Sequence, residues 1–236
     1  FQHLSRGRKK QYRKALAVKI ETAIIASNPF SIEARLVQDE YRYVEYELKY
    51  PQQFSQAPCL RPIIKLELME TIPLLALETR GIQSLVAELY KLPQEVNGFI
   101  CVSVNTTLVE KVLSMLRRTM SVKRDAARSD DVTLVRHIYD VHCIHAAQAL
   151  DNELLAPLFR AILAEDIARF GNQHAEFVMD PANELRLGLQ EIESNPLFRQ
   201  RFNDFVKPMV FNSQPPNFDT CFMSFKHIAT SLILTI

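Results

Sequence analysis

Glycine is scarce in this chain of 236 residues, and tryptophan is absent. The chain has only 5 glycines, whereas glycine makes up about 7% of an average protein. It contains no GxGxxG, GxxxxGK, GxSxG or HExxH motif. These absences exclude glycine-rich phosphate loops, the serine-hydrolase elbow and the helical zinc-protease site. No histidine is followed directly by aspartate, which excludes the usual helical signature of metal phosphohydrolases.

The chain also lacks long apolar runs and closely spaced cysteines. No run approaches the roughly 20 apolar residues that a membrane span requires, so we expect a soluble protein with no membrane partner. The four cysteines, Cys59, Cys101, Cys143 and Cys221, form no CxxC pair, which excludes a zinc ribbon. With no secretory leader in the sequence, this pattern predicts buried, reduced thiols in a cytoplasmic protein.

The composition is that of a folded protein, and its charge is unevenly distributed. Hydrophobic residues make up 47% and charged residues 23% of the chain, with a net charge of +1, which excludes wholesale disorder. Six basic residues and no acid lie between Arg6 and Lys14. Such a stretch forms either an RNA-binding surface or a solvated helix face. The candidate nucleic-acid-binding residues are Arg6, Arg8, Lys9, Lys10 and Arg13. Residues 117–128 form a second basic segment, with the same two interpretations.

Hydrophobic periodicity predicts strands in the first part of the chain and helices in the rest. A helix is expected over 5–26, with Leu16, Ile20 and Ile24 on its apolar face and Asn28-Pro29 at its end. Period-2 alternation predicts an antiparallel pair of strands at 41–50 and 62–68. A short helix at 82–90 and a strand at 99–104, entered through the Asn97-Gly98 turn signal, are expected next.

From Thr106 onward the pattern is helical. Thr107 and Glu110 have the spacing of a capping box, in which the two side chains satisfy free amides at the start of a helix. Further helices are expected at 133–150, 154–170, 183–193, 196–205 and 218–234. The predicted fold class is therefore α+β, with a small mixed sheet followed by a helical region.

Four positions have a spacing that fits either chemistry or an ordinary structural role. Arg136 and Asp140 lie one helical turn apart, as a surface ion pair or as a carboxylate beside a phosphate-binding cation. Lys111 falls in the first turn of the capped helix, where it is either solvated or helps the helix end to attract a phosphate. Glu67 lies on a mostly apolar strand face, as an edge residue or as a metal ligand or base.

His142 and His145 are three residues apart on one expected helix, with Asp140 close by in the sequence. Two imidazoles and a carboxylate are a possible site for a divalent transition metal. The alternative is that one imidazole is hydrogen-bonded in the core and the others are solvated.

The chain resembles the AbiEii/AbiGii toxin family of nucleotidyltransferases in four segments that keep their order. These segments are LSRGRKKQYRKAL (4–16), RPIIKLEL (61–68), VNTTLVEKVLSMLRR (104–118) and LVRHIYDVHCI (134–144). The resemblance covers roughly residues 4–150. It implies a polymerase-β-like nucleotidyltransferase core, which we place at 1–150, and a helical bundle at 151–236.

The resemblance also implies an activity and roles for individual residues. The expected activity is Mg²⁺-dependent transfer of a nucleotide from an NTP to an acceptor such as tRNA, by a toxin with a cognate antitoxin. Glu67 would be a catalytic carboxylate, as metal ligand or base, and Asp140 a second catalytic residue. Lys111 and Arg136 would bind the nucleotide phosphates.

One element of the family pattern does not occur in the printed sequence. In the family, an Asp-x-Asp motif that holds Mg²⁺ and the triphosphate follows a Gly-Gly or Gly-Ser turn and precedes the basic helix. The family pattern also often has Arg-Asp where this chain has Arg136-His137. Two interpretations follow. Either the motif lies upstream of Phe1 in the gene, or the protein is an inactive relative that binds a nucleotide or an antitoxin.

Overall fold

The computed structural model describes residues 1–236 except 2, 28, 54–60 and 213. It has a mixed α+β architecture, as predicted, although both of its sheets are antiparallel rather than mixed. The chain forms two compact units, Phe1–Ile72 and Pro73–Ile236. The boundary expected near residue 150 falls inside the second unit, because α3 (Val104–Arg124) packs against α4 (Arg136–Ala147) and also against later helices. The polymerase-β-like topology remains a prediction.

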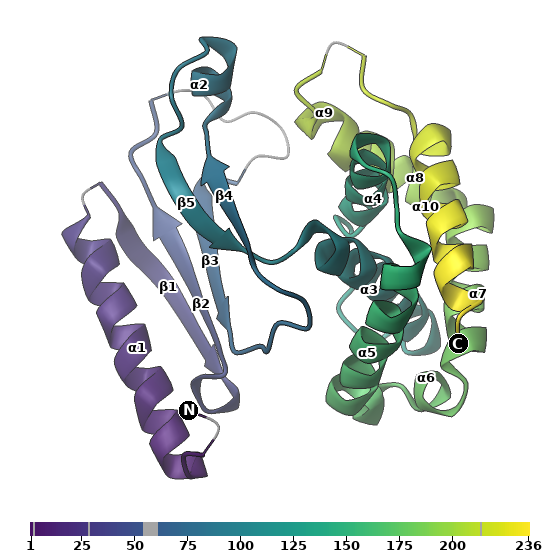
Figure 1. Ribbon diagram of the computed structural model, residues 1–236, viewed down its shortest axis with the longest axis horizontal. Coiled ribbons are helices and arrows are strands. Elements are labelled where there is room, and N and C mark those ends of the chain that lie inside the picture. The colour runs from purple at the N-terminus through teal and green to yellow at the C-terminus, as the bar shows by residue number, and fades with distance from the viewer. Residues whose placement is uncertain (2, 28, 54–60, 213) are drawn as a thin grey trace. The chain divides into compact units, whose positions relative to one another are not determined.

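The first unit is a three-stranded sheet with one helix against it. Helix α1 (Arg6–Ala26) is followed by β1 (Ser31–Gln38), β2 (Tyr43–Lys49) and β3 (Ile63–Met69) in the antiparallel order β1-β2-β3 (Figure 1). The predicted pairing of the second and third strands is confirmed. The first strand was not predicted, because most of its side chains are exposed and give no alternating pattern.

One sheet face packs on α1, and the opposite face carries the polar side chains of β2 and β3. Val44, Tyr46 and Leu48 alternate along β2 and form the buried core of the unit, with Ile20 and Ile24 of α1 packed against them. The expected apolar face of α1 is partly wrong: Leu16 is 50% exposed and Ala17 is 3% exposed. The helix end predicted at Asn28-Pro29 falls partly on Asn28, which lies outside the described residues.

The second unit opens with a two-stranded sheet. β4 (Glu78–Ile82), α2 (Leu85–Leu89) and β5 (Val96–Cys101) follow one another, and the two strands pair antiparallel. The sequence predicted α2 and β5 but not β4. Gly98 lies inside β5 with φ +76° rather than in a turn before it, because this left-handed conformation is open to glycine within a strand.

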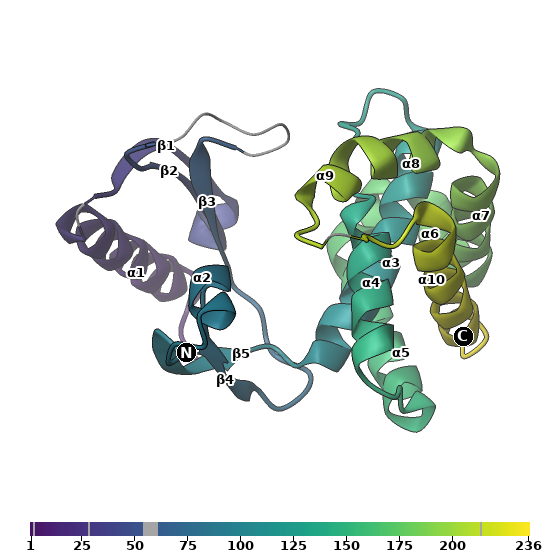
Figure 2. The ribbon, with the colours of Figure 1, turned by 90° about the horizontal axis from the view of Figure 1, so that it is seen from above.

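Helices form the rest of the second unit and share one hydrophobic core. After α3 and α4 come α5 (Asn152–Phe170), α6 (Ala175–Met179), α7 (Pro181–Ser194), α8 (Pro196–Arg201), α9 (Lys207–Met209) and α10 (Phe218–Ile233). Helix α3 packs against α4, α5 and α7 (Figure 2). Its predicted stripe is confirmed, because Leu108, Val112, Leu116 and Met120 are all buried. Within the described part of the chain, no helix has the length and apolar character needed to cross a membrane.

The start of α3 differs from the capping box predicted at Thr107. Helix α3 begins at Val104, and the Ser103 hydroxyl accepts a hydrogen bond from the Thr106 amide at 3.2 Å. The Thr107 hydroxyl instead donates to the Ser103 carbonyl oxygen. Because Ser103 caps the helix, Glu110 lies in its second turn and has no capping role.

The thiols are less buried than the sequence predicted. Among the described cysteines, all of which are free, Cys221 is buried, Cys101 is half-buried and Cys143 is exposed. Cys59 lies outside the described residues.

Gly188 lies where α7 crosses α3. A Cβ atom at this position would lie 2.8 Å from the backbone oxygen of Leu116. Any larger residue therefore forces the two helix backbones apart, since the atom it meets is not a flexible side chain.

We expect Gly188→Ala to lower the free energy of unfolding by about 1–2 kcal/mol. Overpacking costs about 1–3 kcal/mol, and the higher helix propensity of alanine offsets up to about 1 kcal/mol of this. Urea unfolding measures the difference. Gly7→Ala in α1 is the control, because a Cβ atom there meets nothing within 4 Å. A gain in stability at Gly188 like that expected at Gly7 would contradict the close approach of α3 and α7.

Candidate functional site

Two predicted site residues, Lys111 and Asp140, come together in the second unit. Lys111 extends from the second turn of α3 and Asp140 from the middle of α4, and Lys111 Nζ lies 2.6 Å from Asp140 Oδ2. Both side chains are partly exposed, at 26% and 34%. The predicted place of Lys111 in the first helical turn is wrong, because α3 begins at Val104. Its charge therefore meets a carboxylate rather than the free amides of a helix end.

His137 connects the backbone of α3 to α4 directly beneath this pair. Its Nδ1 lies 3.2 Å from the Lys111 carbonyl oxygen, and its side chain is buried. Burial, followed by the nearby positive charge of Lys111, lowers the pKa of His137 to about 4. The imidazole is therefore neutral near pH 7, with its proton on Nδ1 donated to that oxygen. His137 thus fixes the backbone from which Lys111 extends.

The one-turn spacing allowed an ion pair between Arg136 and Asp140, but Arg136 has other partners. Its guanidinium lies 2.6 Å from Thr133 Oγ1 and 3.4 Å from Asp131 Oδ2. Asp131 also accepts from Arg118 at 3.1 Å. Burial raises the pKa of Asp131, but the Thr133 hydrogen bonds and the two guanidinium charges outweigh it and lower the pKa to about 2. Asp131 is therefore an anionic link between Arg118 and Arg136.

Glu67 lies in the first unit, on the sheet face opposite α1. It stands directly across from Glu45 in the register of β2 and β3. The Tyr43 hydroxyl lies 2.6 Å from Glu67 Oε1 and 2.5 Å from Glu45 Oε2. A single hydroxyl proton serves one of these two acceptors at a time.

Glu67 and Glu45 are opposed carboxylates, and the positive charges of Lys65 and Arg61 act on Glu45. Lys65 Nζ lies 2.8 Å from Glu45 Oε2. Its hydrogen bond, followed by that from Tyr43, lowers the pKa of Glu45. Burial and the two carboxylates raise the pKa of Tyr43. Like charges directly opposite one another in a sheet repel, and carboxylate oxygens are ligands that Mg²⁺ takes. The donor chemistry of Glu45 and Glu67 therefore fits part of a magnesium shell.

Glu67 and the Lys111–Asp140 pair thus belong to different units of the chain. The sequence predicted the individual residues but did not single out Tyr43 or Glu45 as neighbours of Glu67. The alternation in β2 already placed both on one face with each other. The register of β2 against β3 then placed Glu45 directly opposite Glu67.

The five candidate nucleic-acid-binding residues of α1 do not form a uniform basic face. Arg6 makes a forked ion pair with Glu40, at 2.8 Å for its shortest contact. Arg13 is buried, pairs with Glu70 and lies over the Phe1 ring. The expectation for Arg13 is therefore wrong, because it faces the sheet side of α1 together with Ala17. Lys9 is half-buried, whereas Arg8 and Lys10 are exposed.

The histidine alternative receives little support. His142 Nδ1 lies 2.9 Å from the Ser224 hydroxyl, and the His145 ring lies 6.0 Å from the His227 ring. Among the residues that the structure describes, no group of three or more His, Cys, Asp or Glu side chains is arranged to hold a metal ion. The two histidines instead face α10, which explains their spacing.

One protein family matches the chain. Its model, described as "Nucleotidyl transferase AbiEii toxin, Type IV TA system", covers residues 2–224. The matched region covers most of both compact units and every predicted site residue. No curated protein and no solved structure matched the chain.

Proposed function

Because the chain belongs to the AbiEii family of nucleotidyl transferase toxins, we propose that it transfers a nucleotide from an NTP to an acceptor. The observation that carries this proposal is the family match over residues 2–224. The type IV toxin–antitoxin description of the family also implies an antitoxin partner. The match favours this interpretation over an inactive nucleotide- or antitoxin-binding module.

We assign the carboxylate role in this reaction to Glu67. Mg²⁺, when bound, neutralises the triphosphate and the charge that develops as the nucleotide is transferred. Glu67 and the opposed Glu45 would supply oxygen ligands for it, and the Tyr43 hydroxyl lies 2.6 Å from Glu67 Oε1. The alternative role of Glu67, which is exposed and so within reach of an acceptor, is that of the base that takes the proton of the acceptor hydroxyl.

Lys111 is the proposed contact to the nucleotide phosphates. Its ammonium is positioned by Asp140 at 2.6 Å and its backbone by His137. An exposure of 26% leaves the ammonium reachable by a ligand. Asp140 acts by orienting Lys111, and Arg136, held by Thr133 and Asp131, adds a second cation on α4.

The proposed acceptor is an RNA such as tRNA. Among the five candidate cations of α1, Arg8 and Lys10 are exposed and support it, and Arg6 is exposed as well but pairs with Glu40. Contacts of such cations with RNA phosphates make binding dependent on salt. The proposal of an RNA acceptor therefore rests on fewer residues of α1 than the five that the sequence predicted.

We expect Lys111→Ala to weaken NTP binding about tenfold or more, because a hydrogen bond to a charged group contributes about 1.5–3 kcal/mol. Calorimetric titration of the full-length protein with each of the four NTPs measures this effect. Lys226→Ala is the control, because Lys226 also pairs with a glutamate, Glu193, but lies on α10. Equal NTP affinity in the Lys111 variant and the native protein would refute the assigned role.

A further inference from the structure

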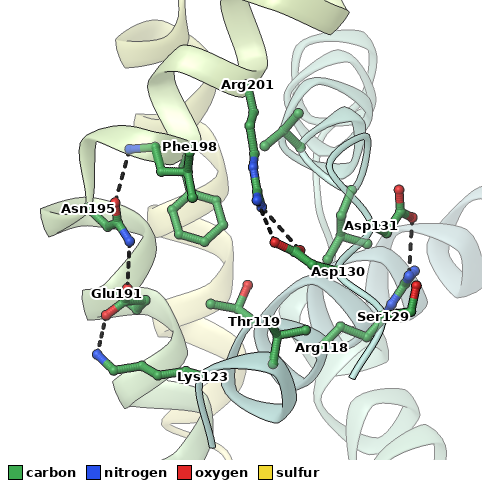
Figure 3. A pocket seen from close by; sticks show the side chains of 14 residues that line it. Arg118, Thr119, Lys123, Ser129, Asp130, Asp131, Glu191, Asn195, Phe198 and Arg201 are labelled. Carbon is green, nitrogen blue, oxygen red and sulfur yellow. Dashed lines mark hydrogen bonds and ion pairs between the residues drawn. The ribbon is translucent and has the colours of Figure 1, made fainter. Parts of the chain in front are cut away.

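A pocket of about 200 Å³ lies within the second unit, between α3, the segment before α4, and the turn from α7 to α8 (Figure 3). Neither Lys111 nor Asp140 lines it. Pockets that hold drug-sized ligands measure about 300–1,000 Å³. This pocket therefore suits a molecule of one or two rings rather than a whole NTP.

The charged side chains of the pocket wall neutralise one another. Arg118 pairs with Asp131, Lys123 with Glu191, and Arg201 with Asp130. The wall therefore carries three positive and three negative charges, each within an ion pair. Because each charge is balanced within its own pair, the wall has no net charge that would attract a phosphate or an ammonium ion. The pocket therefore favours an uncharged ligand.

Thr119 supplies a buried hydroxyl for which the described residues offer no hydrogen-bond partner. It is 7% exposed, and its Oγ1 has no hydrogen-bond partner in the described part of the chain. In Figure 3, Thr119 from α3 and the Phe198 ring from α8 line the same pocket. A buried hydroxyl without a partner is costly, and native proteins contain few of them. A polar atom of a bound molecule would satisfy it.

Apolar side chains form the remainder of the wall. Phe198 is 7% exposed, and Val122, Leu134 and Val135 also line the pocket. A flat ring with apolar faces and a polar edge matches this lining, because aromatic side chains stack on such rings. Asp131 connects this wall to Arg136, our second proposed phosphate-binding cation, through its contacts with Arg118 and Arg136.

We propose that this pocket binds one nucleobase, with its ring against Phe198 and a polar edge atom hydrogen-bonded to Thr119 Oγ1. The uncharged ring follows from the pocket, whereas the choice of a nucleobase rests on the proposed function. The base belongs either to a free nucleoside or to the terminal nucleotide of an RNA acceptor. Both sources present the same ring to the pocket.

The test is a calorimetric titration of the full-length protein, without NTP or metal, with each of the four ribonucleosides and with RNA trinucleotides ending in each base. We expect saturable binding of at least one base. A trinucleotide that binds more tightly than its nucleoside identifies an RNA end as the source, and equal affinities identify the free nucleoside. Thr119→Val keeps the side-chain shape, and we expect it to weaken binding about five- to tenfold through the lost hydrogen bond.

Ser121→Ala is the matched control, because Ser121 is also buried in α3 but does not line the pocket. We expect its affinity to equal that of the native protein. Absence of saturable binding for every probe would overturn the proposal, and so would native affinity in Thr119→Val. Nucleotide transfer without nucleoside binding would refute the pocket alone. Nucleoside binding in a protein that transfers no nucleotide would refute the proposed function alone.

Discussion

Replacing Glu67 by glutamine is expected to reduce nucleotide transfer by about a hundredfold or more. A general base contributes roughly 10²–10⁴-fold to a rate, and the neutral amide also loses charge as a ligand for Mg²⁺. The side chain keeps its size, and the Tyr43 hydroxyl still finds an oxygen acceptor at this position. The stability of the fold should therefore change little. Transfer of labelled nucleotide by the full-length protein to total tRNA measures the rate.

Glu47→Gln is the matched control for this variant. Glu47 lies on the same face of the sheet, on β2, opposite Lys65 rather than opposite a carboxylate. We expect it to keep most of its transfer activity. Equal loss in both variants would indicate a general effect of sheet charge, and full activity in Glu67→Gln would remove Glu67 from the reaction. Calorimetric titration with Mg²⁺ separates the ligand role from the base role, because weaker Mg²⁺ binding in Glu67→Gln indicates that Glu67 is a ligand.

The second large effect concerns stability in acid and depends on His137. The pKa of His137 falls from 6.5 in the unfolded chain to about 4 in the folded protein, so the folded protein resists its protonation. The stabilisation is complete above about pH 6.5 and is lost as the pH falls toward 4. At about 1.4 kcal/mol for each pKa unit, the loss amounts to about 3 kcal/mol.

We expect His137→Gln to remove this loss, so that its free energy of unfolding changes less between pH 6.5 and 4 than that of the native protein. Urea unfolding at intervals of half a pH unit measures both curves. Lys111→Met provides a second comparison, because removing that charge should raise the pKa of His137 and reduce the loss. Parallel curves for the native protein and His137→Gln would show that other groups control acid stability.

The helices and strands differ in how far local sequence patterns predict them. The alternation of apolar and polar residues in 41–50 and 62–68 identified two strands and their pairing, because one face of β2 is buried against α1. The stripe on α3 identified the central helix in the same way. In contrast, β1 leaves most side chains exposed, so its burial pattern carries no period.

The start of α3 shows why helix boundaries were harder to predict. Ser103 and Thr107 both have side chains able to cap a helix, and Glu110 completed the capping-box spacing for Thr107. The structure uses Ser103, and this shift by one turn moves Lys111 away from the free amides. A local motif thus gave a plausible but incorrect environment for a predicted site residue.

The sequence by itself determined the family and the identities of the candidate residues, because ordered motifs and periodicities depend only on nearby positions. The tertiary structure decided which charges meet. Lys111 pairs with Asp140, 29 positions away, while Arg136 turns to Asp131. Long charged side chains reach several partners, and the packing of α3 against α4 selects among them. The pairing of Glu45 with Glu67 and the unpartnered hydroxyl of Thr119 likewise exist only once strands and helices have packed.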